Sequence, residues 1–252
     1  MTEPTTGPHY DLSVVIACYM EEGHLVDSVQ QLTATLDAIG RSYELIFIED
    51  KSRDRTAEIV RQLVDGNRGR GATVTEGFLL ARGDIVGFLD IDLEVHCRFL
   101  PSVLQAIDAG ADGATAFRHY AVGLRPTALL RHFLSSGYRR LFRSVFDVPF
   151  RDPETGFKFF RRERIVPVVR RTKDPAWFWD SEIMILAHQA GLRVVEVPCR
   201  FERRADKQST VRIVRDVYRY LVAITAFRRR QRDEQRTAAA QLRTSDRRAS
   251  SS

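Results

Sequence analysis

The feature of the sequence that most limits the fold is an apolar run that ends in two acids, within the stretch Gly83–Glu94. Apolar residues follow one another here without alternation, which is typical of a strand covered on both faces in the parallel sheet of an α/β protein. Asp90 and Asp92 come directly after this run. Ligands of such sheets bind at the carboxyl ends of the strands, and residues two apart on an extended chain point the same way. Both carboxylates could therefore face one cation.

Two interpretations of these acids are open. A hard cation held by one or two carboxylates usually completes its shell with water and substrate phosphates, so Asp90 and Asp92 indicate a metal–phosphate site. The alternative is an ordinary solvated turn, because Asp-x-Asp alone is a weak signal. The position straight after a buried strand favours the metal–phosphate site.

The first half of the chain alternates predicted strands and helices, which favours an α/β fold with a doubly wound, mostly parallel sheet and helices on both faces. Gly40 is expected to end the first helix, and Asp54 is a candidate cap for the second. Between Val64 and Ala72 there is no room for a strand, so the edge strand expected in this crossover is missing or reduced to a glycine loop. The predicted elements are strands at Leu12–Ala17, at Tyr43–Ile48 and before Asp90, and helices carrying Val26–Ile39, Ala57–Leu63 and Val74–Phe78.

The second half is less regular and ends in a predicted amphipathic helix. Apolar residues from Val211 to Phe227 trace one face of this helix, which also carries arginines. A basic amphipathic helix can pack on the body or lie on an anionic membrane. We expect packing at its start and membrane contact toward its end. The other predicted elements are a helix from Pro101 through Ile107, strands near Ala114–Arg118, Phe157–Phe160 and Arg193–Val197, and helices at Leu129–Val145 and Ser181–Ala190.

Composition narrows the class of protein. A chain of 252 residues can form one large α/β domain with a sizeable core. Its three cysteines have no metal-ligand spacing and are too few for a disulfide framework, which fits a reducing compartment. No signal peptide is visible, and no uncharged segment approaches the roughly 20 residues needed to span a bilayer. We expect a cytoplasmic protein that is soluble or peripheral to the membrane.

The net charge of +6 is concentrated at the C-terminal end. Residues 228–252 carry eight arginines and three acids, a net charge of +5. Such a tail is more often a solvated, disordered end than a binding device. We therefore expect a disordered basic tail at 228–252, with membrane binding as the alternative.

Motifs along the chain carry a family resemblance. They are Val14–Glu22, Ile48–Thr56, Asn67–Ala72 with Gly77, Asp90–Glu94, Arg118, the Arg131/Ser135 helix, Asp152–Phe160, Trp179–Glu182 and Arg203–Ser209. In this order they resemble the family 2 glycosyltransferases, the inverting GT-A type with a Rossmann-like sheet. The later motifs narrow the resemblance to the polyprenol-phosphate glycosyltransferases, over roughly residues 11–215.

The resemblance implies a donor site at the first two loops. Base and ribose binding would fall to Ala17, Tyr19, Glu21 and Asp50. Some positions depart from the family pattern: Ala17 replaces the usual proline, Met20 the usual asparagine and Lys51 the usual glycine. These departures leave the identity of the base open.

The resemblance also implies a cation and an acceptor site. Mg²⁺ or Mn²⁺ bridging the diphosphate would be bound by Asp90, Asp92 and Glu94. The acceptor phosphate would meet Arg118, Arg131 and Ser135, and Lys207 of the last motif would also bind substrate. Asp90, Asp92, Arg118 and Arg131 are thus the expected catalytic residues.

Several of these residues have a plainer interpretation. Arg118 and Arg131 could be solvated charges, and Tyr19 could be an aromatic at the edge of the core. Asp180 and Glu182 could be acids at a helix start, where the helix dipole favours them.

The chemistry of the matched residues agrees with the resemblance. Departure of the leaving group loads negative charge onto a diphosphate, which a divalent cation stabilises, and arginines bind an incoming phosphate bidentately. The sequence predicts metal-dependent, inverting transfer of a hexose from a nucleotide sugar of the GDP-mannose or UDP-glucose type to a polyprenyl or dolichyl phosphate at the cytoplasmic membrane face. Alternatives are transfer to a saccharide or protein hydroxyl, and a non-catalytic protein that binds nucleic acid or membrane through its basic tail.

The expected domain organisation follows from this function. One glycosyltransferase domain would span residues 1–227, with a nucleotide-sugar half at about 11–100 and an acceptor half at about 101–227. We expect no nucleic-acid partner, because the body lacks any interleaving of aromatic and basic residues.

Overall fold

The computed structural model describes residues 8–49, 51–63, 74–120, 142–174, 178–202, 220–234 and 236–237. These residues belong to two compact units. The first unit contains Met1–Lys173 and Trp179–Asp206, and the second contains Asp174–Phe178 and Lys207–Ser252. The predicted division at residue 227 stays a prediction.

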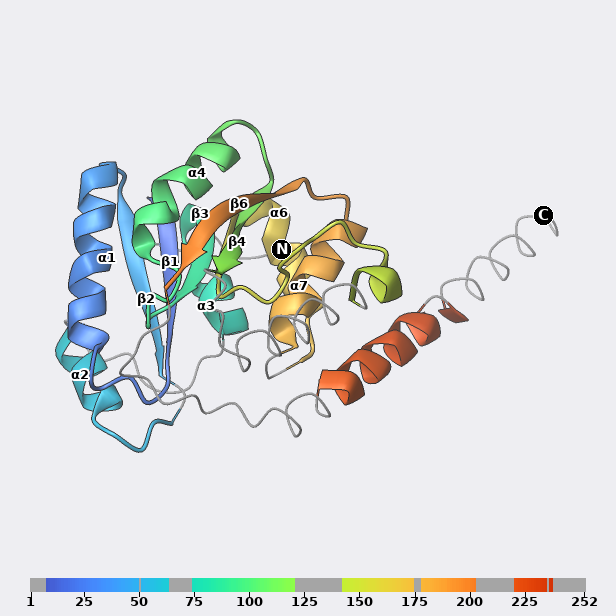
Figure 1. The fold of residues 1–252 in the computed structure, drawn as a ribbon, viewed down its shortest axis with the longest axis horizontal. Helices are drawn as coiled ribbons and strands as arrows, with labels where there is room; N and C mark the ends of the chain where they lie inside the picture. Colours follow the sequence, from blue (N-terminus) through green and yellow to red (C-terminus); the bar gives the residue numbers. More distant parts are fainter. Residues whose placement is uncertain are drawn as a thin grey trace. The chain divides into compact units, whose positions relative to one another are not determined.

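The first unit is built on a six-stranded sheet in the order β2-β1-β3-β5-β4-β6 (Figure 1). β5 runs antiparallel to its neighbours β3 and β4, and the other pairings are parallel. The strands are β1 (Tyr10–Cys18), β2 (Tyr43–Glu49), β3 (Gly83–Asp90), β4 (Gly113–Tyr120), β5 (Phe157–Arg161) and β6 (Val194–Phe201). The mostly parallel α/β sheet predicted from the sequence is confirmed.

Helices cover both faces of this sheet, as the unalternating apolar run of β3 predicts. On one face, Leu12 and Ile16 of β1 belong to a core cluster that includes residues of α1 and α4. On the other face, the ring of Phe88 lies 6.2 Å from Phe78 of α3 and 5.4 Å from Trp179 of α7. The helices are α1 (Leu25–Ile39), α2 (Thr56–Leu63), α3 (Val74–Leu80), the 3₁₀ turn η1 (Cys97–Phe99), α4 (Leu100–Asp108), α6 (Arg162–Val169) and α7 (Trp179–Gln189).

The predicted helix ends are confirmed in the first half. Gly40 takes a left-handed φ of 72° after α1, a conformation that glycine adopts without strain. Asp54 caps α2, because its Oδ1 accepts a hydrogen bond from the backbone N–H of Thr56 at 3.1 Å. The sequence prediction missed α6, whose interior proline, Pro167, is unfavourable in a helix.

Some predictions fall on residues outside the described ranges. The short crossover between Val64 and Ala72 lies there, as does the predicted helix at Leu129–Val145 except for residues 142–145, which are helical.

The second unit contains a helical segment at residues 220–234, followed by helical residues 236 and 237. Within this unit the ring of Phe178 packs edge-on against Tyr220 and Phe227, at 5.3 and 5.6 Å. The helix therefore continues past residue 227 as far as residue 234, and the expected disorder of the tail stays a prediction. The arginines there have a high helix propensity.

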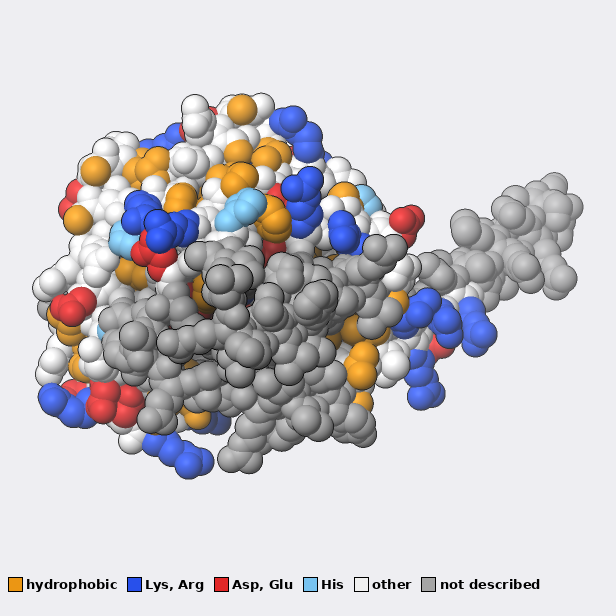
Figure 2. All heavy atoms as spheres, viewed as in Figure 1, with side chains coloured by type: hydrophobic (Ala, Val, Ile, Leu, Met, Phe, Trp, Pro, Cys, Tyr) orange, Lys and Arg blue, Asp and Glu red, His pale blue; other side chains and the backbone are white. Residues whose placement is uncertain are grey.

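This helical segment is strongly basic. Lys and Arg side chains gather along it in Figure 2, and they include Arg228, Arg229, Arg230 and Arg232. Within the described ranges, none of the helices is long and apolar enough to cross a membrane.

Candidate active site

The predicted acids lie at the carboxyl end of β3, beside the loop that leads into β5. The strand register places Asp90 opposite Ala17 of β1. The backbone N–H of Asp90 donates to the carbonyl of Gly156 at 2.8 Å. A Cβ atom on Gly156 would fall 1.9 Å from the Asp90 Oδ2 atom. A side chain at position 156 would therefore displace the Asp90 carboxylate, which occupies the space that a Cβ atom would need.

Asp90 is an unusual acid because other carboxylates lie nearby. Solvent reaches it on one side, but burial by the protein on its other sides, together with the charges of Asp92 and Asp180, raises the pKa of Asp90 to about 8. The positive charges of Lys158 and Arg118 act in the opposite direction without cancelling this effect. These five side chains therefore form one group of interacting charges, which we call the charge cluster.

The rest of the predicted metal motif is half-buried in the loop after β3. Asp92 accepts a hydrogen bond from the backbone N–H of Glu94 through its Oδ1 atom, at 3.2 Å. Among the described residues, no three acid, histidine or cysteine side chains converge as a ready metal site. The donor set nevertheless fits a hard cation, because such cations bind through one or two carboxylates plus water and substrate phosphates. Mutual repulsion of the carboxylates also favours a bound positive charge.

Lys158 supplies a fixed positive charge inside the cluster, and the sequence analysis gave it no role. Its side chain is fully buried, 5.3 Å from the centre of the Phe88 ring. Its Nζ donates to the Asp180 Oδ1 atom at 2.9 Å and to the carbonyl of Thr155. The signal in the sequence was a lysine within a run of phenylalanines, Phe157–Phe160, since a buried lysine requires a partner.

Asp180 is the second residue of α7, and the sequence analysis gave it only the plainer interpretation of a helix-start acid. It does lie in the first turn of that helix. Burial raises the pKa of Asp180 even though Lys158 and Arg118 favour its charged form. Its neighbour Glu182 is fully buried and accepts from the backbone N–H of Lys173 at 3.0 Å. Asp180 therefore belongs to the candidate site, whereas Glu182 ties α7 to Lys173 in the segment after α6.

Arg118 is held in the cluster by Asp152, which the sequence analysis placed in a motif without a role. The Arg118 Nε and Nη2 atoms each donate to one oxygen of Asp152, at 2.7 Å, and the Arg118 backbone N–H donates at 3.1 Å. Burial opposes ionisation of Asp152, but hydrogen bonds from Arg118 and its charge outweigh that effect and lower the pKa of Asp152. The bidentate pair fixes the plane of the guanidinium.

The predicted donor loop follows β1 and is tied to the loop after β2. Tyr19 is 54% exposed, so the edge-of-core interpretation does not hold for it. The backbone N–H groups of Met20 and Glu21 donate to the side chains of Ser52 and Thr56, at 3.1 and 2.8 Å. The carboxylate of Glu21 is largely buried and contacts a histidine, His24.

Residues with a left-handed backbone conformation follow the carboxyl ends of three parallel strands. Met20 after β1, Lys51 after β2 and Leu93 after β3 have φ values of 59°, 53° and 52°. Non-glycine residues seldom adopt this conformation, and it recurs where function requires a special loop shape. The asparagine and glycine usual in the resembling family at positions 20 and 51 are the residues that tolerate it best. The two departures therefore keep the loop shape at a cost in backbone strain.

Four predicted site residues lie outside the described ranges: Asp50, Arg131, Ser135 and Lys207. Of the remaining ones, Asp90, Asp92 and Arg118 come together in the charge cluster, and Ala17 adjoins it. Tyr19 and Glu21 lie on the donor loop.

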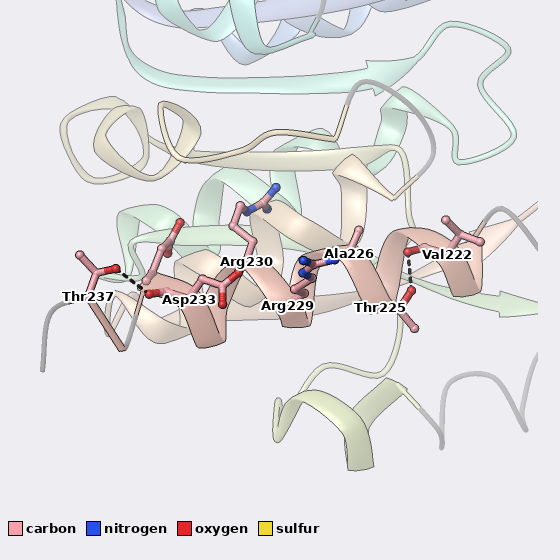
Figure 3. Close-up of a pocket in the computed structure, with 8 residues that line it drawn as sticks. Val222, Thr225, Ala226, Arg229, Arg230, Asp233 and Thr237 are labelled. Atoms are coloured by element: carbon pink, nitrogen blue, oxygen red, sulfur yellow. Dashed lines mark hydrogen bonds between the residues drawn. The ribbon is translucent and has the colours of Figure 1, made fainter. Parts of the chain in front are cut away.

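A separate hollow lies on the helical segment of the second unit (Figure 3). Its lining runs along one helix from Val222 to Thr237 and includes Arg229, Arg230 and Asp233. None of the charge-cluster residues lines it, so it is not the candidate active site.

The fold and the site define a class. The chain superposes on a mannosyltransferase from Pyrobaculum calidifontis, solved in complex with GDP-Man and Mn²⁺, with a TM-score of 0.52 and 14% identity. That match covers 79% of this chain and 59% of the other. The sheet with acids at the end of its third strand is therefore that of a GT-A glycosyltransferase fold.

The sequence comparisons name the family. The pattern of Glycosyl transferase family 2 matches residues 13–165, and the chain belongs to that family. It is 30% identical over 226 residues to Glycosyltransferase AglD of Haloferax volcanii, a match covering 84% of this chain but only 36% of AglD. It is 25% identical over 232 residues to the Dolichyl-phosphate beta-glucosyltransferase of Saccharomyces cerevisiae, covering 77% of this chain and 69% of the relative. The chain thus spans about a third of the length of AglD.

Proposed function

We propose that this protein transfers a hexose from a nucleotide sugar to a polyprenyl phosphate, with inversion at the anomeric carbon. A phosphate oxygen of the acceptor forms a bond to the anomeric carbon while the bond from that carbon to the nucleoside diphosphate breaks. The observation that carries the proposal is the charge cluster, in which carboxylates and the Arg118–Asp152 pair meet at the carboxyl ends of the strands. Such a site suits two phosphate-bearing substrates.

The donor would bind over the first two loops. Tyr19 offers an exposed ring for the base, and Ala17, Glu21 and Asp50 would complete the base and ribose site. The hydrogen bond from Met20 to Ser52 supports this assignment, because it fixes the two loops against each other.

A divalent cation, Mg²⁺ or Mn²⁺, would be held by Asp90 and Asp92, with Glu94 beside them. When bound, it would stabilise the negative charge that develops on the diphosphate. The raised pKa of Asp90 is consistent with the assignment, because burial and the nearby charges of Asp92 and Asp180 disfavour its ionised form and a bound cation would favour it. Lys158 would hold Asp180 in place beside this site.

The acceptor phosphate would meet Arg118, together with Arg131, Ser135 and Lys207. A phosphate monoester is already anionic at neutral pH, with a second pKa of about 6, so it needs cationic positioning rather than a base. The name of the yeast relative, a dolichyl-phosphate glucosyltransferase, supports a lipid phosphate as the acceptor.

The lipid acceptor implies contact with the cytoplasmic face of a membrane. The basic helix after Phe227 would supply it, because each Lys or Arg near an anionic surface contributes about 1 kcal/mol. Deleting residues 228–252 should weaken co-sedimentation with anionic liposomes and spare donor binding. Unchanged sedimentation would contradict a membrane role for this segment.

A second candidate function is transfer to a hydroxyl group. Asp180 favours it, since burial raises the pKa of this acid and a hydroxyl acceptor needs a positioned general base. Asp180→Asn would then abolish turnover, whereas with a phosphate acceptor it should cost less activity than Arg118→Ala.

One experiment tests the proposed function. UDP-, GDP- and dTDP-sugars are screened with Mn²⁺ by thermal shift, because a ligand that binds only the native state raises the melting temperature. The donor that binds is then incubated with farnesyl phosphate or with farnesol, and products are identified by mass spectrometry. A glycosyl phosphate formed only from farnesyl phosphate is expected. The proposal would be overturned if a product formed from farnesol but not from farnesyl phosphate. It would also be overturned if none of the donors raised the melting temperature of the protein.

A further inference from the structure

Glu196 of β6 holds the loop that carries Asp152. Its Oε1 atom accepts hydrogen bonds from the backbone N–H groups of Arg151 and Asp152, at 2.7 and 2.8 Å. Glu196 is half-buried, and burial raises its pKa despite these two bonds. One carboxylate oxygen thus fixes two successive peptide groups.

The same loop orients Arg118. β4 and β6 are parallel neighbours, with Thr115 opposite Glu196 and Arg118 opposite Cys199. The Asp152 peptide is fixed to β6 by Glu196, and the Asp152 carboxylate is fixed to Arg118 on β4 by three hydrogen bonds. Asp152 therefore links the two strands, and its position depends on contacts at both ends.

This loop has little regular structure of its own to hold it. Residues 148–156 form neither helix nor strand, so their backbone groups depend on side-chain partners. Without Glu196, the exposed N–H of Arg151 and the partly buried N–H of Asp152 would lose their acceptor, and the Asp152 carboxylate could shift. A shift of about 1 Å in a positioning group is enough to reduce activity about a hundredfold.

We propose that Glu196 is a positioning residue for the acceptor phosphate, acting through the Asp152 peptide and carboxylate on the Arg118 guanidinium. This inference rests on the proposed function, because it assumes that Arg118 meets the acceptor. It adds a residue on β6 that contacts neither substrate.

The test compares four variants with wild type: E196A, E196Q, E196D and R118A. Steady-state kinetics vary farnesyl phosphate at saturating donor, and then the donor at fixed farnesyl phosphate. We expect E196A to raise the acceptor KM about tenfold, the loss expected when two hydrogen bonds of modest net strength are removed. E196Q should restore most of the acceptor affinity, because an amide oxygen accepts the same two bonds. The acceptor KM of E196D should lie between those of E196A and E196Q, since the shorter side chain moves the carboxylate oxygen away from the two N–H groups.

The matched control is E202A. Glu202 follows the end of the same strand, and its carboxylate pairs with Arg98 at 2.8 Å and Arg200 at 3.4 Å. Loss of a surface pair there should leave both KM values within about twofold of wild type. The donor KM should also stay within about twofold in E196A.

A structural readout accompanies the kinetics. The Arg118 Nε–H signal in ¹⁵N NMR is expected to exchange slowly with water in wild type and E196Q, and faster in E196A and E196D. This readout needs no substrate and remains usable in E196D and E196Q if E196A does not fold.

The outcomes separate the two proposals. If R118A leaves the acceptor KM unchanged, the acceptor site of the proposed function is wrong, and the inference with it. If R118A raises the acceptor KM but neither E196A nor E196D does, only the inference is overturned. The inference is also overturned if the acceptor KM rises equally in E196A and E196Q, or if the donor KM of E196A rises as much as its acceptor KM. Either result would show that Glu196 has a merely structural role.

Discussion

Asp90 belongs to the charge cluster and Asp152 contacts it through Arg118, but the environments of these two acids shift their pKa values in opposite directions. Asp152 is buried against Arg118, and the bidentate pair lowers its pKa. Asp90 faces Asp92 and Asp180, and its pKa is raised to about 8. Burial opposes ionisation of both acids, so the difference comes from the neighbouring charges.

This difference separates two kinds of acid in one site. Asp152 has a counter-ion supplied by the protein and therefore acts as a support for Arg118. Asp90 has none of comparable strength among the described residues, and a cation from solution would relieve its repulsion from Asp92. The carboxylate whose pKa is raised is thus the one that we assign to metal binding.

The largest expected effect is on activity. Asp90→Ala and Asp92→Ala should each lower metal-dependent turnover by about a thousandfold or more, since the cation contributes several kcal/mol to stabilising the leaving diphosphate. The fold should remain, because β3 is held by its apolar residues. Turnover with added Mn²⁺ and circular dichroism measure the two effects.

The control for these variants is Asp84→Ala. Asp84 is the second residue of the same strand, is exposed and pairs with an exposed histidine, His9. It should keep wild-type turnover. Normal activity in either Asp90→Ala or Asp92→Ala would contradict the metal assignment.

The next largest effect is on stability. Asp152→Asn should lower the free energy of unfolding by about 3 kcal/mol, because it leaves the partly buried Arg118 without its counter-ion. Urea unfolding followed by circular dichroism measures this. Glu58→Gln, which breaks an exposed pair with Arg55, should cost less than about 1 kcal/mol. Similar losses in both variants would show that the Arg118–Asp152 pair is no stronger than a surface contact.

The two acids also predict opposite pH dependences in the presence of EDTA. Because the pKa of Asp152 is lowered on folding, its stabilisation is present above about pH 4 and is lost as the pH falls through its folded pKa. Because the pKa of Asp90 is raised on folding, stability should decline as the pH rises from about 4 toward 8.

Urea unfolding across this pH range tests both signs. Asp152→Asn should reduce the loss of stability at acid pH, and Asp90→Asn should reduce the decline between pH 5 and 8. If the free energy of unfolding of Asp90→Asn declines as much between pH 5 and 8 as that of the wild type, the decline belongs to another group.

The smallest expected effect concerns the donor loop. Lys51→Gly should raise the free energy of unfolding by about 1 kcal/mol, because glycine adopts the left-handed conformation of residue 51 without strain. Lys173→Gly, at a residue without a positive φ, should lower it instead. Thermal unfolding of both variants decides, and destabilisation by Lys51→Gly would mean that its side chain makes a compensating contact.

The sequence predicted the sheet because its signals are local. Apolar runs of strand length, Gly40 and the cap at Asp54 each act within a few residues, and the structure confirms them. α6 was missed because its interior proline, Pro167, argues against a helix in the sequence, although packing of its buried residues stabilises one.

The site was predicted only where its residues sit in a motif beside a strand end. Asp90 and Asp92 were proposed because they lie at the carboxyl end of an apolar strand, β3. Asp152 and Lys158 were quoted within a motif, yet their roles depend on partners 34 and 22 residues away in the chain, Arg118 and Asp180. A single sequence does not reveal such pairings.

The central claim is that Asp90 and Asp92 at the end of β3, and not Asp152, bind the cation. Electron paramagnetic resonance of free Mn²⁺ tests it, because the signal falls as the ion binds to protein. Mn²⁺ is titrated into wild type, Asp90→Asn and Asp152→Asn without nucleotide. We predict that wild type and Asp152→Asn deplete free Mn²⁺ alike, whereas Asp90→Asn binds it at least tenfold more weakly. Equal depletion by Asp90→Asn, or depletion lost in Asp152→Asn but kept in Asp90→Asn, would contradict the account.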